Sequence, residues 1–151
     1  MRILLTGDYF NNYQIDKKDF IELKKNFQRY DFVVLNYEGT FKSKFKLNKS
    51  IHLAMGQNSL NLPKNSVLNL CNNHFYDFGK VGLKKLIKQI KKKKIKYFGL
   101  NKNINNLSNF VILKFKEKKL FISSLGCKNE ECVTATKTRI GVLDFTKDSI
   151  N

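Results

Sequence analysis

A polar stretch, Asn-Asn-His-Phe-Tyr-Asp-Phe-Gly at residues 72–79, lies directly between an apolar run at 67–71 and a helix-like segment that begins near Lys80. Loops of this kind carry chemistry in α/β proteins, because the carboxyl ends of buried strands open into a crevice. Asparagine, histidine and aspartate are ligands of hard or borderline metals, and Gly79 allows the backbone to turn tightly. On these residues alone, a functional loop and a polar loop that only caps the next helix are both open interpretations.

Two earlier apolar runs end in a similar way. The run at 3–5 is a predicted buried strand that leads into Gly7-Asp8, and the run at 32–35 leads into Asn-Tyr-Glu-Gly. Between them, Asp16 is placed to cap a helix that extends to about residue 30. Two successive strands therefore deliver a carboxylate and a glycine at the same end, and residues 66–71 form the third predicted strand.

The remaining elements continue the alternation. Apolar residues at helical spacing occupy 80–94, with lysines on the opposite face, and a short strand follows at 95–100. Residues 110–115 and 120–125 predict an antiparallel hairpin. The whole pattern predicts one α/β domain over residues 1–151, a layered sheet with helices on its faces.

Three segments leave alternatives open. Residues 40–50 are basic and predict a loop or an edge strand, and residues 51–55 predict a short strand. His52 lies in that short strand and is more typical of a structural histidine than of a ligand. Residues 140–145 predict a last strand or an extended tail.

The chain is strongly basic, with 29 Lys and Arg against 12 Asp and Glu and a formal net charge of +17. This balance favours phosphates, nucleic acids or anionic surfaces as partners. Arginine, the side chain that reads phosphate and guanine with two parallel hydrogen bonds, occurs only at Arg2, Arg29 and Arg139. Nucleic-acid binding therefore ranks below a solvated basic surface.

The three cysteines, Cys71, Cys127 and Cys132, do not form an even disulfide framework, and the close pair lacks a second pair for a zinc site. The apolar run after Met1 is too short for a signal peptide or a membrane span. We therefore expect a reduced, cytoplasmic protein without a membrane span.

The chemistry-bearing residues all follow predicted strands. Because parallel strands bring their carboxyl ends to one edge, we expect Asp8, Glu38 and the 72–79 loop to converge. Carboxylate, amide and imidazole groups that converge in this way suit a divalent metal. Such a centre polarises a phosphoryl or carbonyl oxygen and lowers the pKa of bound water.

The order of these motifs resembles the CapA-type poly-γ-glutamate capsule synthesis family, which is related to the calcineurin-like metallophosphoesterases. The resemblance rests on Leu-Thr-Gly-Asp at 5–8, Asn-Tyr-Glu-Gly at 36–39 and Asn-Asn-His-x-x-Asp-x-Gly at 72–79, and the last motif is the most specific. It extends from about Arg2 to Gly126. The resemblance implies a metallophosphoesterase-like α/β fold, which in the complete family has α/β/β/α layers.

The resemblance also implies roles for individual residues. Asp8, Glu38 and Asn73 fall on metal-binding positions, with Mn, Fe, Zn or Mg as the divalent ion. His74 falls on the position that contacts the phosphate or leaving group of the substrate. Asp77 is implied to fix the orientation and tautomer of His74, and capping of the following helix is its alternative role.

The chain departs from the family in two respects. Cys71 stands where the family usually has alanine, which is also small. The family continues with a His-x-Gly strand end and a later Gly-His-x-x-His segment, whereas His52 and His74 are the only histidines here. We therefore expect the N-terminal half of the family domain, truncated at its C-terminus and completed by a second copy or by a partner chain.

Three functions follow from these observations. The first is metal-dependent hydrolysis of a phosphoester or related bond in capsule or surface-polymer biosynthesis, on a small-molecule or polymer substrate with phosphate or carboxylate groups. The second is a non-catalytic relative that binds an anionic polymer through its lysines, and the missing histidines leave the choice between the two open. The third, ranked last, is nonspecific nucleic-acid binding by the basic surface.

Overall fold

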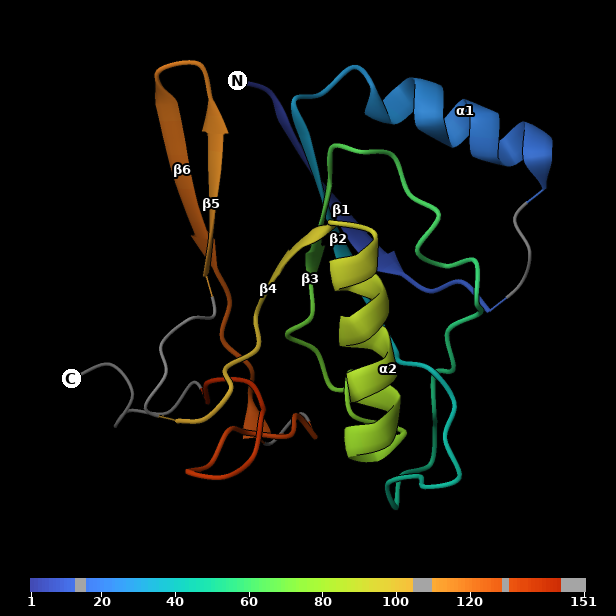
Figure 1. The fold of residues 1–151 in the computed structure, drawn as a ribbon, viewed down its shortest axis with the longest axis vertical. Coiled ribbons are helices and arrows are strands. Elements are labelled where there is room, and N and C mark those ends of the chain that lie inside the picture. Colours follow the sequence, from blue (N-terminus) through green and yellow to red (C-terminus); the bar gives the residue numbers. More distant parts are fainter. Residues whose placement is uncertain (13–15, 105–109, 129–130, 145–151) are drawn as a thin grey trace.

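The computed structural model describes residues 1–12, 16–104, 110–128 and 131–144 (Figure 1). In chain order its elements are β1 (Ile3–Tyr9), α1 (Lys17–Phe27), β2 (Phe32–Tyr37), β3 (Ser66–Asn69), α2 (Gly79–Lys92), β4 (Lys96–Phe98), β5 (Phe110–Phe115) and β6 (Lys118–Ser123). The α/β class expected from the sequence is confirmed.

The main sheet has four parallel strands in the spatial order β1-β2-β3-β4, which is also their order along the chain. α1 connects β1 to β2, and α2 connects β3 to β4. Because such crossovers are right-handed, successive steps in one direction place both helices on the same face of the sheet. Figure 1 shows both helices on one side of the sheet and the β5–β6 hairpin on the other.

Alternate residues of β2 face the two sides of the sheet. Leu35 packs in the larger core cluster with Phe27 of α1 and Leu86 of α2. Its neighbour Val34 belongs to a second cluster with Leu113 of β5. The described part of the chain therefore has helices on one face of the sheet only, and the hairpin covers the other face.

Several local predictions are confirmed. Asp16 is the N-cap of α1, and its Oδ1 accepts a hydrogen bond from the Lys18 backbone N–H at 2.6 Å. The predicted hairpin forms, although β6 begins at Lys118, two residues before the predicted start. The short turn between its strands places Lys116 at φ +52°, in the left-handed region.

The first strand differs from the prediction in length and exposure. The sequence predicts a buried strand at 3–5, whereas β1 continues to Tyr9 and its Leu5 is 70% exposed. β1 is the edge of the sheet, so one of its faces has little cover. The polar residues after Leu5 therefore prolong the strand instead of ending it.

The strand predicted at 51–55 is absent, and only an isolated parallel bridge between Thr40 and Ala54 forms there. Residues 141, 142 and 144 likewise make isolated bridges, while residue 145 of the predicted last segment lies outside the described residues. None of the described helices is long and apolar enough to cross a membrane.

Candidate functional site

An irregularity in β1 brings its carboxylate into register with β2. Leu5 pairs with Val34 and Asp8 pairs with Asn36, so three residue steps on β1 match two steps on β2. In regular pairing Gly7 would stand opposite Asn36, and Asp8 would point to the other face. The bulge therefore turns Asp8 toward Asn36, in keeping with the general tendency of bulges to redirect a side chain near a site.

The Asp8 and Glu38 carboxylates share one hydrogen-bond donor. Asn36 Nδ2 donates to Asp8 Oδ1 at 2.7 Å and to Glu38 Oε1 at 3.1 Å. Burial and the nearby Asp8 charge raise the pKa of Glu38, whereas the His74 charge and the Asn36 hydrogen bond oppose that rise. The structure thus brings Asp8 and Glu38 together, and the amide between them offsets part of their repulsion.

Side-chain amides connect this carboxylate pair to the third strand end. Asn36 Oδ1 accepts from Asn69 Nδ2 at 3.2 Å and from Asn72 Nδ2 at 3.5 Å. Asn72 Nδ2 also donates to the Tyr37 carbonyl at 2.9 Å, and its Oδ1 accepts from the His74 backbone N–H at 3.0 Å. The amide network fixes the loop after β3 against the end of β2.

His74 and Asp77 form a tight pair within this loop. His74 Nδ1 lies 2.7 Å from Asp77 Oδ2, and Asp77 is fully buried. The same carboxylate accepts from the Leu53 backbone N–H at 2.8 Å and from Lys49 Nζ at 3.2 Å. Three donors therefore satisfy a carboxylate that would otherwise be costly to bury.

The alternative role of Asp77 as a helix cap is wrong. The N-cap of α2 is Phe78, and no side chain makes a capping hydrogen bond there. The Asp77 carboxylate is directed instead to His74, Lys49 and Leu53. The contact to His74 that the sequence implies is present, and its catalytic role stays a prediction.

Asn73 lies in the same loop, between Asn72 and His74 in the chain. Its backbone carbonyl accepts a hydrogen bond from Lys49 Nζ at 2.7 Å. Among the described residues, no hydrogen bond involves the side chain of Asn73 or the Nε2 atom of His74. An amide oxygen and an imidazole nitrogen of this loop are therefore available for a ligand.

Lys49 is the residue that sequence reasoning missed. Its side chain is only 7% exposed and bridges Asp77 and Glu131, with Nζ at 3.2 Å and 3.5 Å from their carboxylate oxygens. No sequence signal separates it from the neighbouring solvated lysines at 42, 44 and 46. Asn36 belongs to a motif that the sequence identifies, but the sequence assigns it no role. Asn69 interrupts an apolar strand, and such an interruption can indicate a buried polar contact.

The cysteines near the site are unpaired. Cys71 follows β3, and burial raises the pKa of its thiol to about 11, with an opposing hydrogen bond to Ser124. Burial likewise raises the pKa of Cys132. Cys71, Cys127 and Cys132 are all free, and the two raised pKa values favour inert neutral thiols over metal-binding thiolates.

The side chains at the strand ends can be compared with the ligands that divalent metals prefer. Within the part of the chain that the structure describes, no three His, Cys, Asp or Glu side chains group closely enough to hold a metal ion. Two carboxylates do converge, with an amide oxygen donor at Asn73 in the adjoining loop. Mg²⁺ and similar hard ions keep several waters and bind through one or two carboxylates, so these residues fit such an ion better than zinc or iron.

This chain is similar to known proteins. The family model described as "Bacterial capsule synthesis protein PGA_cap" matches residues 4–149. The "Capsule biosynthesis protein CapA" of Bacillus anthracis is 34% identical in an alignment of 89 residues that covers 54% of this chain and 22% of that relative. The chain thus aligns with less than a quarter of the relative's length.

Proposed function

This chain belongs to the family of bacterial capsule synthesis proteins. From that premise we propose that it hydrolyses a phosphoester or related bond, with the help of a divalent ion bound at the carboxyl ends of β1, β2 and β3. The observation that carries the proposal is the single Asn36 amide group that donates to both Asp8 and Glu38. Two carboxylates held at one point, beside an imidazole, suit ion-assisted chemistry on an anionic substrate.

Asp8 and Glu38 are the proposed ligands of the ion, with the Asn73 side chain as the neutral donor. The oxygen-rich set favours Mg²⁺ or Mn²⁺. When bound, the ion supplies positive charge next to the anionic oxygens of the substrate. The basic surface of the chain, with its formal charge of +17, attracts a phosphate- or carboxylate-bearing substrate toward the site.

His74 is the proposed proton carrier. The Asp77 carboxylate only accepts hydrogen bonds, so the ring nitrogen that faces it, Nδ1 of His74, carries a proton. This leaves Nε2 as the atom presented to the substrate. When the ring carries a second proton there, Nε2–H gives that proton to the leaving oxygen or donates a hydrogen bond to a developing anionic oxygen, and the ring returns to the neutral form after proton transfer. Lys49 and Leu53 keep Asp77 in place and thereby fix the ring.

Metal binding is tested first. We expect the purified chain to bind Mn²⁺ stoichiometrically in isothermal titration, and Asp8→Asn and Glu38→Gln to weaken binding at least about tenfold, because each removes a charged ligand. Glu22→Gln, which neutralises an exposed glutamate on α1, is the matched control and should bind as the wild type does. Absence of stoichiometric binding by the wild type would refute the proposal.

Hydrolysis is tested separately with bis(p-nitrophenyl) phosphate as the substrate. His74→Gln should keep the wild-type affinity for Mn²⁺ and lower turnover by about 10²–10⁴-fold, the usual contribution of a positioned proton donor. Equal turnover in wild type and variant would remove His74 from the mechanism while leaving the ion site intact.

A further inference from the structure

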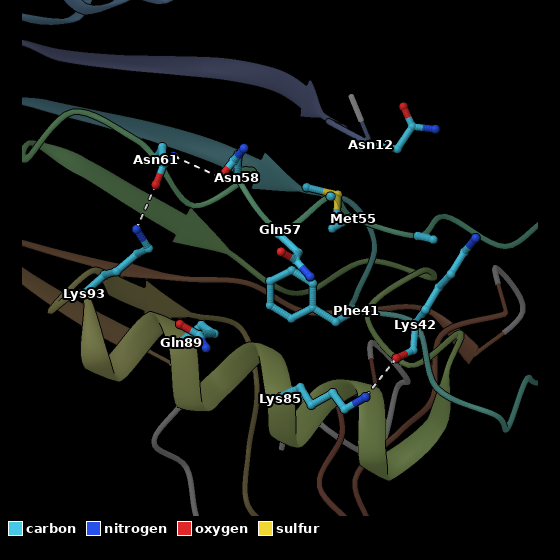
Figure 2. Close-up of a pocket in the computed structure, with 12 residues that line it drawn as sticks. Asn12, Phe41, Lys42, Met55, Gln57, Asn58, Asn61, Lys85, Gln89 and Lys93 are labelled. Carbon is cyan, nitrogen blue, oxygen red and sulfur yellow. Dashed lines mark hydrogen bonds between the residues drawn. The ribbon is translucent and has the colours of Figure 1, made fainter. Parts of the chain in front are cut away.

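A concave pocket lies beside α2, and its lining includes Asn12 and Phe41, which follow β1 and β2 in the chain (Figure 2). Its volume is about 840 Å³, within the usual range for small-molecule sites. Segments 41–42 and 54–61 form one wall and α2 forms the other, with Asn12 at one end. Their close approach has a local cause, because a Cβ at Gly82 of α2 would lie 2.5 Å from the Phe41 carbonyl oxygen.

The lining of this pocket has one sign of charge. Lys42, Lys85 and Lys93 contribute ammonium groups, and no aspartate or glutamate among the described residues lines the pocket. The side-chain amides come from five residues, Asn12, Gln57, Asn58, Asn61 and Gln89. A concave, uniformly positive surface concentrates the electrostatic field and attracts anions.

Two of the ammonium groups are held in place across the pocket. Lys85 Nζ donates to the Lys42 carbonyl at 3.2 Å, and Lys93 Nζ donates to Asn61 Oδ1 at 2.8 Å (Figure 2). Each ammonium has three donors, so two on each remain for a ligand. No described carboxylate lies within ion-pair distance of Lys42, Lys85 or Lys93.

An apolar floor completes the pocket. Met55 is 5% exposed and belongs to the main core, and Phe41 packs against that core. Exposed lysines of the hairpin, such as Lys114 and Lys118, have the same charge but line none of the described pockets. The pocket differs from the hairpin surface because it combines positive charge, neutral hydrogen-bond donors and a concave apolar base. This combination suits a ligand with both anionic and polar groups.

We propose that this pocket binds a ligand that carries at least two oxyanion groups, carboxylates or phosphates, spaced to reach Lys42, Lys85 and Lys93. The amides of Asn58, Asn61, Gln57 and Gln89 hydrogen-bond the neutral polar groups of the same ligand. Asp8, Glu38, Asn73, His74 and Asp77 do not line the pocket, so the proposal stands whether or not the strand-end site binds a metal.

The test uses metal-free protein and two probes, citrate for carboxylates and pyrophosphate for phosphates, in isothermal titration. We expect at least one probe to bind with a dissociation constant of about 1 mM or tighter at low salt. Binding of citrate alone identifies a carboxylate ligand, and binding of pyrophosphate alone identifies a phosphate ligand. Failure of both probes would overturn the proposal.

Variants separate the pocket from general surface charge. The triple variant Lys42→Gln, Lys85→Gln, Lys93→Gln should weaken probe binding at least about tenfold, since it removes the charge-assisted hydrogen bonds. The control Lys114→Gln, Lys118→Gln, Lys119→Gln removes the same charge from the hairpin and should leave the affinity unchanged. Equal weakening in both triples would show that net charge alone attracts the probe, and would overturn the proposal.

A near-isosteric variant covers the case in which the triple variant unfolds. Gln57→Glu places a carboxylate in the pocket without a change in size and should also weaken binding, whereas Gln28→Glu at the end of α1 should not. His74→Gln, which changes the strand-end side chain that can face an anion, should keep the wild-type affinity for the probes. Loss of probe binding in His74→Gln would place the anion at the strand-end site and refute a separate pocket.

Discussion

The two halves of the strand-end site are built in opposite ways. Asp77 is fully buried and satisfied by three donors, whereas Asp8 is exposed and shares its donor with a second carboxylate. The Asp77 half contains both signs of charge, and the Asp8 half contains only negative charge. One half is therefore organised before any ligand arrives, while the other gains most from a cation.

This difference predicts opposite effects on stability. Buried charges are costly to leave unpaired, so the His74–Asp77–Lys49 half should be sensitive to any change. Exposed like charges are screened and slightly unfavourable, so the Asp8–Glu38 half should tolerate neutralisation. Such a division is common where a site is prepared for a ligand at the expense of folding stability.

The largest expected effect is that of Asp77→Ala. It leaves the Leu53 N–H buried without a partner and removes the buried carboxylate beside the Lys49 ammonium, which keeps only the Asn73 carbonyl and the exposed Glu131 carboxylate. We expect a loss of about 3–5 kcal/mol in the free energy of unfolding. Asp8→Ala, at the exposed half, should change it by no more than about 0.5 kcal/mol. Urea unfolding of both variants measures the difference, and faster hydrogen exchange of the Leu53 amide in Asp77→Ala would locate it. Equal losses in the two variants would contradict the division.

A smaller effect is expected for Lys49→Met, which keeps the apolar stem and removes the ammonium. Asp77 retains His74 and Leu53 as donors, but the Asn73 carbonyl loses its partner, so we expect a loss of about 1–3 kcal/mol. Lys46→Met, at an exposed position of the same segment, is the control and should lie within about 0.5 kcal/mol of the wild type. A Lys49→Met protein as stable as the control would show that Lys49 is only a surface charge.

The fold was largely predictable because its signals are local. The apolar runs at 32–35 and 66–71, the Asp16 cap and the helical spacing in α2 each depend on neighbouring residues, and each of these is confirmed. The length of β1 was not predictable, because its exposure depends on its place at the sheet edge. The strand predicted at 51–55 does not form for a related reason, because strand pairing there is limited to a single bridge between Thr40 and Ala54.

The site was predictable only in part. Asp8, Glu38, Asn73, His74 and Asp77 stand out in the sequence because each comes after a predicted strand, although Asp8 lies inside β1 in the structure. The bulge that turns Asp8 toward Asn36 depends on pairing between strands, which no single stretch of sequence encodes. Lys49 escaped for a similar reason, since only the folded chain distinguishes a buried lysine from its solvated neighbours.

The smallest effect, Glu38→Gln, should have the opposite sign. Glu38 is partly buried beside Asp8, and both features raise its pKa above the ordinary value of 4.5. Because the folded state then holds the proton more tightly than the unfolded state, the stability of the wild type falls as the pH rises through and above this value. Glu38→Gln lacks that titration, and solvent screening limits its gain at neutral pH to about 0.5 kcal/mol.

Thermal unfolding at pH 4 and pH 7 measures this gain, with Glu22→Gln as the control. The gain should shrink at the lower pH, where the wild-type carboxyl is largely protonated, and Glu22→Gln should show neither the gain nor its pH dependence. Saturating Mn²⁺ should reverse the order at neutral pH, because a bound ion stabilises more strongly the protein that retains both carboxylates. Destabilisation by Glu38→Gln at pH 7 without metal would give the opposite result. It would show that the Asn36 hydrogen bond to Glu38 contributes more than the repulsion from Asp8 costs, and it would contradict the expected tolerance of the Asp8–Glu38 half to neutralisation.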